Sequence, residues 1–275
     1  MLLTLVICTL GRTEQLRRLL ESLRRQSETS FKAIVVDQNE PGFLAPILDA
    51  FHDLPIMHVR SPLGLSRARN AGIALADTRL VGFPDDDCWY RPTTVAEVIS
   101  RFQNDPNLDL LTGRTIDEDG EDSVSAHLPV SQPITKANVF LAGNTNTFFA
   151  RQKAVQLSGG FDETLGVGAG TEFGSGEETD FLIRCLNAGC NVRYERDFLI
   201  HHDQVSRDPA TIGRYSTGFG RVARIHNLGT GFVGIRIARA AARSVLFAVS
   251  GNMGQARSRW AWIKGCLAGF TASRS

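Results

Sequence analysis

The first part of the chain alternates between short apolar runs and segments with helical periodicity. Residues 3–8 form a continuous apolar run, and Leu16, Leu19, Leu20 and Leu23 then repeat at the spacing of one helix face within residues 13–25. The same order continues with strands expected over residues 33–36, 56–59 and 80–83, and with helices expected near 47–51 and over 66–76. Further on, short strands are expected over residues 146–150 and 191–194, with a helix over residues 179–188 between them. This alternation is typical of βαβ units, so we predict an α/β fold with a largely parallel sheet.

Charge divides the chain into two parts. The whole chain has 275 residues, 43% of them hydrophobic, and a net charge of +1, which allows one sizeable core. Residues 207–275 contain ten Arg and one Lys but a single acid, Asp208, so the first 206 residues are acidic overall. We therefore expect an acidic α/β domain over residues 1–205 and a basic helical extension over residues 206–275.

Cysteine usage and the N-terminus indicate where the protein works. The five cysteines are odd in number, scattered and free of any CxxC pair, so we expect neither a zinc site nor a disulfide framework. A reducing, cytoplasmic location fits this pattern. The apolar N-terminus MLLTLVICTLGR has no basic leader region and no cleavage site, so we interpret it as a first buried strand rather than a signal peptide.

The strongest local motif is FPDDDCWYRP, residues 83–92, in which three consecutive aspartates follow an apolar strand. Adjacent like charges repel each other unless a cation neutralises them. Mg²⁺ or Mn²⁺ is suited to this, held by one or two carboxylates and by the phosphates of a substrate. Thr9 and Asp37 also end predicted strands, where functional residues of open sheets gather. The alternative is a solvated acidic turn that caps a helix beginning at Thr93.

A second motif combines glycines with acids. The segment GVGAGTEFGSG, residues 166–176, is rich enough in glycine to let its backbone approach a ligand closely. Glu177, Glu178 and Asp180 follow it and open a predicted helix. A carboxylate at this place can accept the proton of an attacking hydroxyl. Helix capping is the alternative interpretation, because acids in a first turn suit the helix dipole.

Three further segments carry weaker signals. A neutral imidazole binds metals well, so His201 or His202 could complete a metal site, although a lone histidine is more often structural. Arg67 and Arg69 begin a predicted helix in LGLSRARNAG, and arginine pairs well with diphosphate oxygens, although a solvated helix face is the default. The amides of GNTNTFF, residues 143–149, are candidates for hydrogen bonds to a sugar.

Taken together and in this order, these segments resemble family 2 of the GT-A glycosyltransferases over residues 3–205. The resemblance rests on VICTLGR, VVDQNEPG, GLSRARNAG, FPDDDCWYRP, GGFDETLG with GAGTEFGSGEETDF, and the late histidine pair. It implies a GT-A mixed sheet flanked by helices, followed by the C-terminal helical extension. It also implies an inverting, metal-dependent enzyme that moves one sugar from a nucleoside-diphosphate donor, with UDP as the expected nucleotide, to a saccharide or lipid-linked acceptor. Cell-surface polysaccharide or glycolipid synthesis is the expected setting.

The resemblance also assigns roles to residues. The donor contacts are Thr9, Asp37, Arg67, Asp85 and Asp86. The expected Mg²⁺ or Mn²⁺ ligands are Asp87, Asp85 and one of His202 and His201, with Asp87 touching the metal directly. The acidic pair of the family matches Glu177 and Glu178, and the general base would be Glu178 where the family has Asp. The expected acceptor or sugar contacts are Trp89, Asn144, Asn146 and Gly176.

Two rival functions stay open at this point. A sugar-phosphate nucleotidyltransferase also uses a metal, but it would show a glycine-rich, basic phosphate loop after the first strand, where this chain has TLGRTEQ. A catalytically inactive membrane-surface binding module would have lost part of the acidic set, which is complete here. We expect no nucleic-acid partner.

The basic extension predicts contact with a membrane surface. Ile235, Ala238, Ala242, Val245 and Leu246 form one helical stripe, with Arg236, Arg239 and Arg243 beside it and tryptophans at 260 and 262. This composition is typical of a helix that lies in the interface of an anionic membrane. The longest uncharged apolar run is about a dozen residues, too short for a bilayer-spanning helix, which needs about 18 or more. The alternative is that these helices pack back on the acidic domain.

Overall fold

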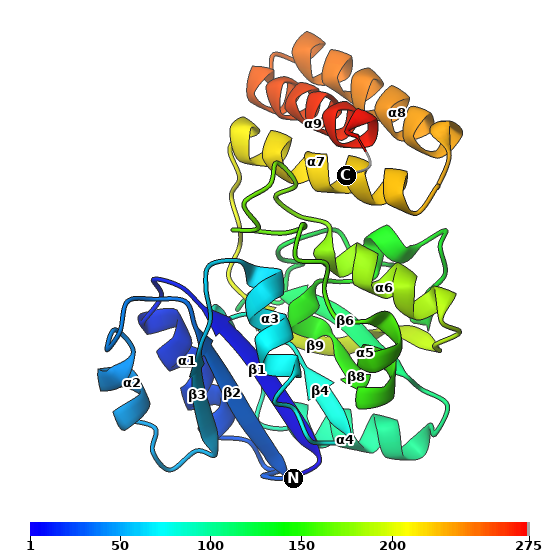
Figure 1. Ribbon diagram of the computed structural model, residues 1–275. Helices are drawn as coiled ribbons and strands as arrows, with labels where there is room; N and C mark the ends of the chain where they lie inside the picture. The colour runs from blue at the N-terminus through cyan, green and yellow to red at the C-terminus, as the bar shows by residue number, and fades with distance from the viewer. Residues whose placement is uncertain (274–275) are drawn as a thin grey trace. The chain divides into compact units, whose positions relative to one another are not determined.

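The computed structural model describes residues 1–273 and divides into two compact units (Figure 1). Unit 1 consists of residues 1–63, 67–161 and 181–205, and unit 2 consists of residues 64–66, 162–180 and 206–275. This division differs from the expected one, 1–205 and 206–275, in one main respect. The glycine-rich segment 162–180 groups with the C-terminal helices, because its backbone and side chains pack on one of them, as described below.

Unit 1 is built on a mixed sheet with the strand order β3-β2-β1-β4-β8-β6-β9-β5, and β7 pairs with β9. Strands β1 to β4 pair in parallel, whereas β8 runs antiparallel to both β4 and β6. The strands are β1 (Leu3–Thr9), β2 (Phe31–Asp37), β3 (Ile56–Arg60), β4 (Leu80–Gly82), β5 (Cys88–Trp89), β6 (Leu110–Ile116), β7 (Gln132–Pro133), β8 (Phe149–Arg151) and β9 (Val192–His202). The expected α/β class with a mixed sheet is confirmed.

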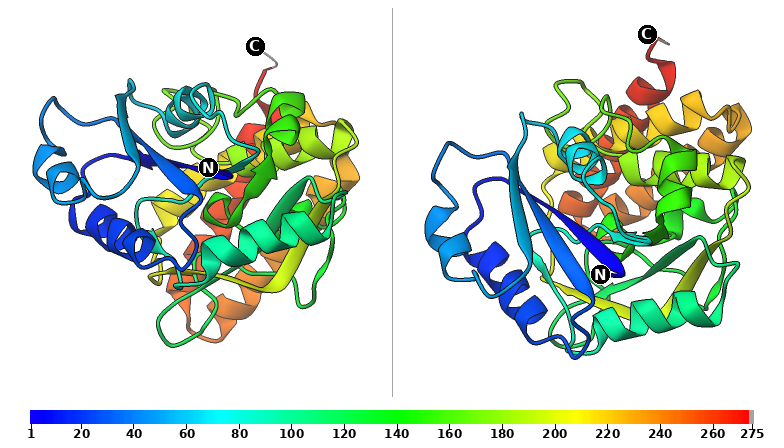
Figure 2. Two further views of the ribbon diagram at one scale, coloured as in Figure 1. Left: turned by 90° about the horizontal axis from the view of Figure 1, so that it is seen from below. Right: turned by 60° about the horizontal axis from the view of Figure 1, so that its bottom comes forward.

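Helices cover both faces of this sheet (Figure 2). Alternate residues of β1, from Leu3 to Ile7, join the leucines of α1 and the apolar face of α4 in one core. On the other face, α3 approaches so closely that a Cβ on Gly72 would lie 2.3 Å from Val6. The helices of this unit, with α3 and α6 each shared with unit 2, are α1 (Glu14–Arg24), α2 (Ala45–Asp49), α3 (Leu65–Ile73), α4 (Thr94–Asn104), α5 (Gln152–Ser158) and α6 (Glu177–Asn187).

The strand register collects polar residues at one edge of the sheet. Thr9 and Asp37 are direct partners at the ends of β1 and β2. A further bridge joins Cys8 to Asp85, just after β4. Because β8 runs antiparallel to β4, its first residue lies beside the last residue of β4, so the loop before β8 reaches the same edge. The edge therefore gathers side chains that are far apart in the sequence.

Two secondary-structure predictions need correction. A strand was expected from Asn146, but residues 145–147 form a short 3-10 turn and β8 begins only at Phe149. The short strand expected over residues 191–194 continues to His202, because β9 pairs with β6 along one side and with β5 at its end. Both histidines of the late pair therefore lie on a strand.

Unit 2 contains three long helices, α7 (Pro209–Ile225), α8 (Thr230–Val249) and α9 (Met253–Thr271), as the basic extension predicts. Glycines let α9 lie against α7, since a Cβ on Gly265 would come within 2.0 Å of the carbonyl oxygen of Gly213. Ala223, Val233 and Cys266 form the centre of a small core among the three helices. No helix within residues 1–273 combines the length and the apolar character needed to cross a bilayer.

Candidate functional site

The three aspartates that follow β4 lie among cations of unit 1. The Arg12 guanidinium donates to Asp86 at 2.9 Å and also pairs with Asp87. Arg69, which is almost fully buried, donates to Asp85 at 3.0 Å. Thus Asp85, Asp86 and Asp87 form one carboxylate cluster, and its mutual repulsion is offset by cations from the turn after β1 and from α3.

His202 reaches this cluster, whereas His201 does not. The Nε2 atom of His202 lies 3.1 Å from Asp87, and its Nδ1 atom lies 2.7 Å from the carbonyl oxygen of Asp203. Successive residues of a strand point to opposite faces, so His201 instead stacks on Trp89, with ring centroids 5.3 Å apart. Of the two histidines predicted as metal ligands, the structure brings only His202 to the aspartates.

Burial and the neighbouring charges set the protonation of the cluster. Burial raises the pKa of Asp86 above its ordinary value, against the opposing effect of Arg12. Burial acts in the same direction on Asp87, but its hydrogen bond and charge interaction with His202, together with Arg12, hold its pKa below the ordinary value. Burial disfavours the charged form of His202, yet Asp87 outweighs it and raises the pKa of His202. Asp87 is therefore the more firmly ionised of the two carboxylates.

Asp37 forms a second polar centre at the end of β2. It is 1% exposed, and its carboxylate accepts from the backbone and side-chain nitrogens of Asn39 at 2.8 Å each. His58 lies 3.0 Å from its other oxygen, and Asn39 in turn accepts from the backbone nitrogen of Gly11. Arg60 donates to the carbonyl oxygen of Asn39 at 2.6 Å. The orientation of the Asp37 carboxylate is therefore fixed from several sides.

Several of these partners were not predicted from the sequence. The contact of Asn39 with Asp37 could have been predicted, since an Asp two residues before an Asn favours a local turn in which the side chain accepts from the backbone. The contacts of His58 and Arg60 could not have been predicted from the local sequence, because these residues reach the site only through the lateral pairing of β3 with β2. Arg12 was part of a quoted motif but had no role assigned. Thr9 lies where it was expected, buried at the end of β1 beside Asp37.

Two predicted contacts have other neighbours in the structure. Trp89 lies between His201 and Arg18, whose guanidinium is 3.9 Å from the ring centroid. Arg18 also donates to the backbone oxygen of Asp87 at 3.1 Å. Arg67 donates to the carbonyl oxygen of Leu63. Arg69, on the same helix, pairs with Asp85 of the carboxylate cluster.

The two candidate sugar-binding amides differ in their partners. Asn144 donates to Thr115 and accepts from Ser125, both at 3.2 Å. Asn146 is 0% exposed, and neither its side-chain oxygen nor its nitrogen has a hydrogen-bond partner within residues 1–273. Buried amides are nearly always paired, so an unpaired one needs a reason. A ligand with matching polar groups would supply the missing partners.

The glycine-rich segment places the acidic pair in unit 2. Glu177 is buried, and a Cβ on Gly166 would lie 3.0 Å from its carboxylate. Glu178 is partly exposed at the start of α6. Gly176 has a φ of +100°, and a Cβ there would lie 3.0 Å from the carbonyl oxygen of Gly218 on α7. Only glycine fits this position, because the backbone is left-handed and closely packed.

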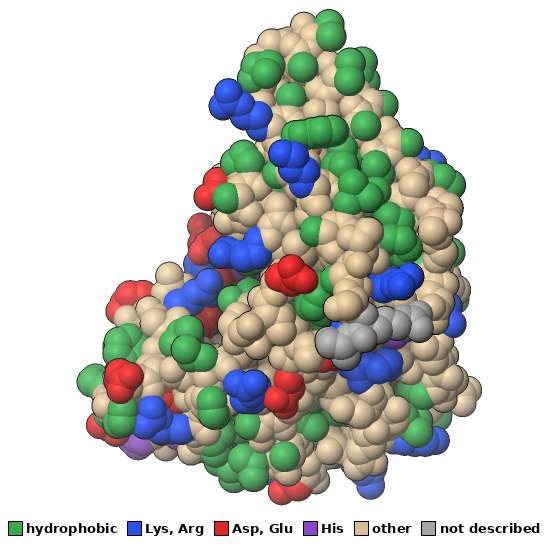
Figure 3. Space-filling view, turned by 45° about the horizontal axis from the view of Figure 1, so that its top comes forward, with side chains coloured by type: hydrophobic (Ala, Val, Ile, Leu, Met, Phe, Trp, Pro, Cys, Tyr) green, Lys and Arg blue, Asp and Glu red, His purple; other side chains and the backbone are tan. Residues whose placement is uncertain are grey.

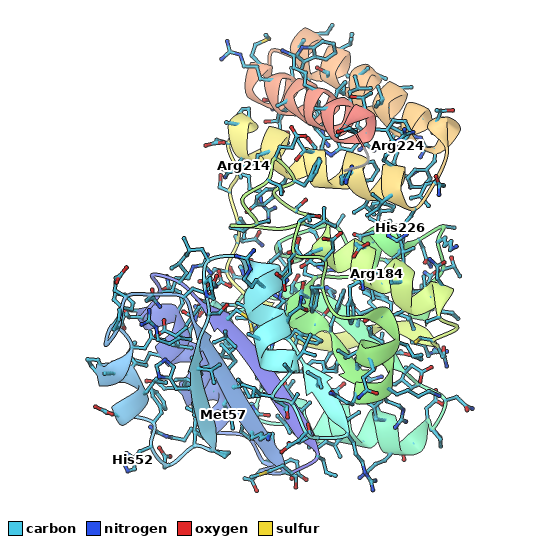
Figure 4. The ribbon with its side chains drawn as sticks, in the orientation of Figure 1. His52, Met57, Arg184, Arg214, Arg224 and His226 are labelled. Atoms are coloured by element: carbon cyan, nitrogen blue, oxygen red, sulfur yellow. The ribbon has the colours of Figure 1, made fainter. Side chains whose placement is uncertain are left out.

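Helix α7 holds this segment from several directions. Ser175 donates to the carbonyl oxygen of Tyr215 at 2.6 Å, and the guanidinium of Arg221 lies 4.8 Å from the ring centroid of Phe173. His226, just past the end of α7 (Figure 4), lies 2.8 Å from the buried carboxylate of Asp180. From the sequence alone, helix capping was a sufficient explanation for Asp180. In the structure, Asp180 is also the partner of a histidine that lies 46 residues further along the chain.

The residues present suit a divalent cation of the Mg²⁺ or Mn²⁺ type. Within the part of the chain that the structure describes, no group of three or more His, Cys, Asp or Glu side chains is arranged to hold a metal. Such cations, however, usually take one or two carboxylates and complete their coordination with water and substrate phosphates. Carboxylates of the cluster offer that donor set. The five cysteines are free and buried, and burial raises the pKa of Cys8 to about 12, so it stays a thiol.

The fold matches solved structures of GT-A glycosyltransferases. The structure of S. aureus TarS 1–349 in complex with UDP-GlcNAc superposes with a TM-score of 0.63, at 13% identity, over 96% of this chain and 92% of that one. The mannosyltransferase PcManGT from Pyrobaculum calidifontis, in complex with GDP-Man and Mn²⁺, gives a TM-score of 0.69, at 13% identity, over 98% of this chain and 87% of that one. These likenesses define the fold as the GT-A type.

The profile of Glycosyl transferase family 2 matches residues 4–163, and the chain belongs to this family. A pre-mycofactocin glycosyltransferase of Mycobacterium tuberculosis is 29% identical over 215 residues, which cover 73% of this chain and 42% of that protein. An uncharacterized glycosyltransferase of Haemophilus influenzae is 24% identical over 112 residues, 40% of this chain and 37% of that protein. The chain thus spans about two fifths of the length of these curated relatives. The predicted family is confirmed.

Proposed function

We propose that this protein transfers a sugar from a nucleoside-diphosphate donor to an acceptor hydroxyl, with inversion at the anomeric carbon. The observation that carries the proposal is the carboxylate cluster at the carboxyl edge of the sheet, in a member of glycosyl transferase family 2. A second polar centre, Asp37, ends the neighbouring parallel strand. Ligands of open α/β sheets bind at this edge.

The donor nucleoside is assigned to Asp37 and Thr9. A buried carboxylate that is held by Asn39 and His58 keeps a fixed orientation, which suits recognition of a ribose hydroxyl or a base N–H group. UDP is the nucleotide we propose, since TarS binds UDP-GlcNAc, although PcManGT binds GDP-Man. The diphosphate is assigned to the carboxylate cluster, where Arg67 and Arg69 of α3 supply positive charge.

Asp85 and Asp87 would hold the Mg²⁺ or Mn²⁺, with His202 beside Asp87. Bound there, the cation would neutralise the charge that develops on the departing diphosphate. Asp86 is the carboxylate whose pKa burial raises, and we assign it to the donor rather than to the cation. His202 holds Asp87 in place by the contact of 3.1 Å, whereas His201 supports Trp89.

Glu178 is proposed as the general base, because it is partly exposed where Glu177 is buried. The acceptor oxygen forms a bond to the anomeric carbon as the bond from that carbon to the diphosphate breaks. The electron pair leaves with the diphosphate, and the acceptor proton passes to the Glu178 carboxylate. Attack from the face opposite the leaving group inverts the anomeric centre, and no covalent enzyme intermediate forms.

The acceptor is proposed to be a saccharide or a lipid-linked molecule used in cell-surface polysaccharide or glycolipid synthesis. Trp89, Asn144, Asn146 and Gly176 are assigned to the acceptor or to the transferred sugar. The unpaired amide of Asn146 is the strongest of these assignments, because a sugar hydroxyl can both donate to and accept from it. Five free cysteines support a reducing compartment on the cytoplasmic side.

The test is a panel of UDP, GDP, dTDP and CDP sugars, each incubated with the full chain and Mn²⁺ or Mg²⁺. We expect one nucleotide to raise the melting temperature in the presence of the metal, because ligands stabilise the state that they bind. We also expect its sugar donor to release nucleoside diphosphate with inverted anomeric configuration in the product, read by nuclear magnetic resonance. Release of pyrophosphate from a nucleoside triphosphate and a sugar phosphate would instead identify a nucleotidyltransferase and contradict the proposal.

A further inference from the structure

Helix α8 exposes an apolar stripe to solvent. Ile235 is 56% exposed, Leu246 is 68% exposed and Val249 is 83% exposed. With Ala238 and Ala242 between them, these residues recur every three or four positions and therefore share one helix face. The side of α8 that packs in unit 2 is a different one, with Val233 and Ala240 buried. The helix thus has two apolar faces, and only one of them is covered.

Positive charge borders this exposed stripe. Arg239 and Arg243 follow Ile235 at intervals of four residues, so they lie along one edge of the stripe, and both are exposed. Arg236, on the inner side, instead lies over the ring of Phe232 at 3.5 Å. The sequence has no Asp or Glu between residues 209 and 275. In Figure 3, hydrophobic and basic side chains share the uppermost part of the view, and acidic side chains are absent from it.

We propose that this face of α8 docks on the surface of an anionic lipid bilayer. The exposed stripe runs for about 21 Å, at 1.5 Å per residue, along a single helix. A helix of this kind lies in the plane of the membrane, with its apolar face in the boundary between headgroups and acyl chains. Arg239 and Arg243 then lie at the level of the lipid phosphates. The helix lies on the bilayer rather than across it, in keeping with the lack of a spanning helix within residues 1–273.

Charge favours the bilayer over a second copy of the chain. In a symmetric dimer the same patch meets itself, so the arginines of one copy would face those of the other. No acid follows Asp208 in the helices to pair with them. An anionic bilayer offers negatively charged headgroups along the whole length of the stripe, and an apolar acyl-chain region below those headgroups. The same surface therefore repels its own copy and attracts acidic lipid.

Co-sedimentation of the full chain with lipid vesicles tests this docking. Vesicles of phosphatidylcholine alone are compared with vesicles that also contain phosphatidylglycerol, at low and at high salt. We expect binding only to the anionic vesicles and weaker binding at high salt, because salt screens surface charge. Arg239→Gln with Arg243→Gln should lower the partition coefficient about 30-fold, from about 1 kcal/mol for each basic residue near the surface.

The apolar part of the stripe has its own variant. Leu246→Ser with Val249→Ser should lower partition at least about 10-fold, because two apolar side chains no longer enter the lipid. The matched controls lie in unit 1. Arg17→Gln with Arg25→Gln removes two surface charges, one from a half-buried and one from an exposed residue, and Leu157→Ser changes a leucine that is 51% exposed; neither should alter binding. Circular dichroism and melting curves verify that all variants are folded.

A spectroscopic measurement locates the contact. The fluorescence of Leu246→Trp, taken as the difference from the unsubstituted chain, should shift to the blue with anionic vesicles, and that of Leu157→Trp should not. Equal sedimentation of the unsubstituted chain and both stripe variants, or an unchanged Leu246→Trp spectrum, would overturn the proposal. Self-association in the absence of lipid that Leu246→Ser with Val249→Ser abolishes would overturn it as well, in favour of a second copy. The stripe lies outside the residues proposed for sugar transfer, so failure here leaves that function untouched.

Discussion

In unit 1 the clustered acidic side chains are paired with basic side chains. In the helices of unit 2, by contrast, basic side chains lie in a stretch of sequence that has no acidic residues after Asp208. In unit 1, Asp85, Asp86 and Asp87 are met by Arg12, Arg69 and His202 from three different elements. In unit 2, the exposed arginines of α8 belong to a stretch of sequence with no acid after Asp208. Charges that are compensated within a fold are held in fixed positions, as catalysis requires. Uncompensated charge beside apolar surface instead fits a partner outside the fold.

The largest expected effect comes from Asp87→Ala. This change removes the carboxylate that contacts both Arg12 and His202. It also removes the carboxylate whose pKa is held below the ordinary value, and which therefore stays ionised. We expect loss of sugar transfer and of Mn²⁺-dependent nucleotide binding with an intact fold, because the side chain contributes little to the core. Turnover and calorimetric binding are the measurements. Asp53→Ala, which breaks a surface pair with Arg24, is the control, and near-normal turnover of Asp87→Ala would contradict the assignment.

Next in size is the expected effect of Glu178→Gln. We expect it to keep donor affinity but to lower turnover by about 10²-fold or more, the usual scale for loss of a general base. Glu177→Gln is the matched variant, since it changes the neighbouring carboxylate, which is buried. Steady-state kinetics with both variants decides between them. A larger loss of turnover in Glu177→Gln would mean that the two glutamates have the opposite roles.

Asn146→Leu should improve stability and impair binding at once. Replacing an unpaired buried amide by an apolar group of similar size should raise the free energy of unfolding by about 1 kcal/mol. The KM for the donor or the acceptor should rise about 5-fold, since one hydrogen bond to the sugar is worth about 1 kcal/mol.

Asn144→Leu is the control for Asn146→Leu, because Asn144 has hydrogen bonds to Thr115 and Ser125. Replacing this amide removes both hydrogen bonds from a buried site, so this variant should destabilise the fold. Denaturant unfolding separates the two cases. Loss of stability in both variants would show that the amide of Asn146 is satisfied in the free protein.

The smallest effect is expected for Arg12→Gln. Its guanidinium competes with a bound cation for Asp86 and Asp87, so its removal should tighten the binding of Mn²⁺ alone. Arg12 is 46% exposed, and an ion pair so close to solvent is worth at most about 1 kcal/mol, which corresponds to about 5-fold in the dissociation constant. Calorimetry without nucleotide measures this. Arg24→Gln should leave Mn²⁺ binding unchanged, and weaker binding by Arg12→Gln would show that the arginine does not compete.

The strand ends could be predicted from the sequence alone. Buried parallel strands are continuous apolar runs, and Thr9, Asp37 and Asp85 directly follow or end such runs. Their common edge then follows from the parallel pairing of β1 with its neighbours. The strand β6 was missed because its sequence, LLTGRTI, mixes apolar with polar residues, although the fold buries nearly all of it.

Lateral contacts could not be predicted in the same way. The pairing of His58 with Asp37 depends on the order of strands in the sheet, which local periodicity does not specify. Which of His201 and His202 faces the aspartates could be decided only once β9 was known to extend to His202. Successive residues of a strand point to opposite faces, so only one of the two can face them. The contact of Gly176 with Gly218 joins segments about 40 residues apart, and only the packing of α7 explains it.

The close packing of residues 162–180 on α7 affects how such chains can be recombined. The two segments of unit 2 are separated in the sequence by the end of unit 1, yet Ser175 and Asp180 depend on partners at Tyr215 and His226. A hybrid enzyme joined at residue 205 would combine the loop of one parent with the helices of another. Glu177 and Glu178 would then follow a loop that packs on an α7 helix from the other parent. Both segments must therefore be inherited together, and the helices cannot be exchanged as an independent module.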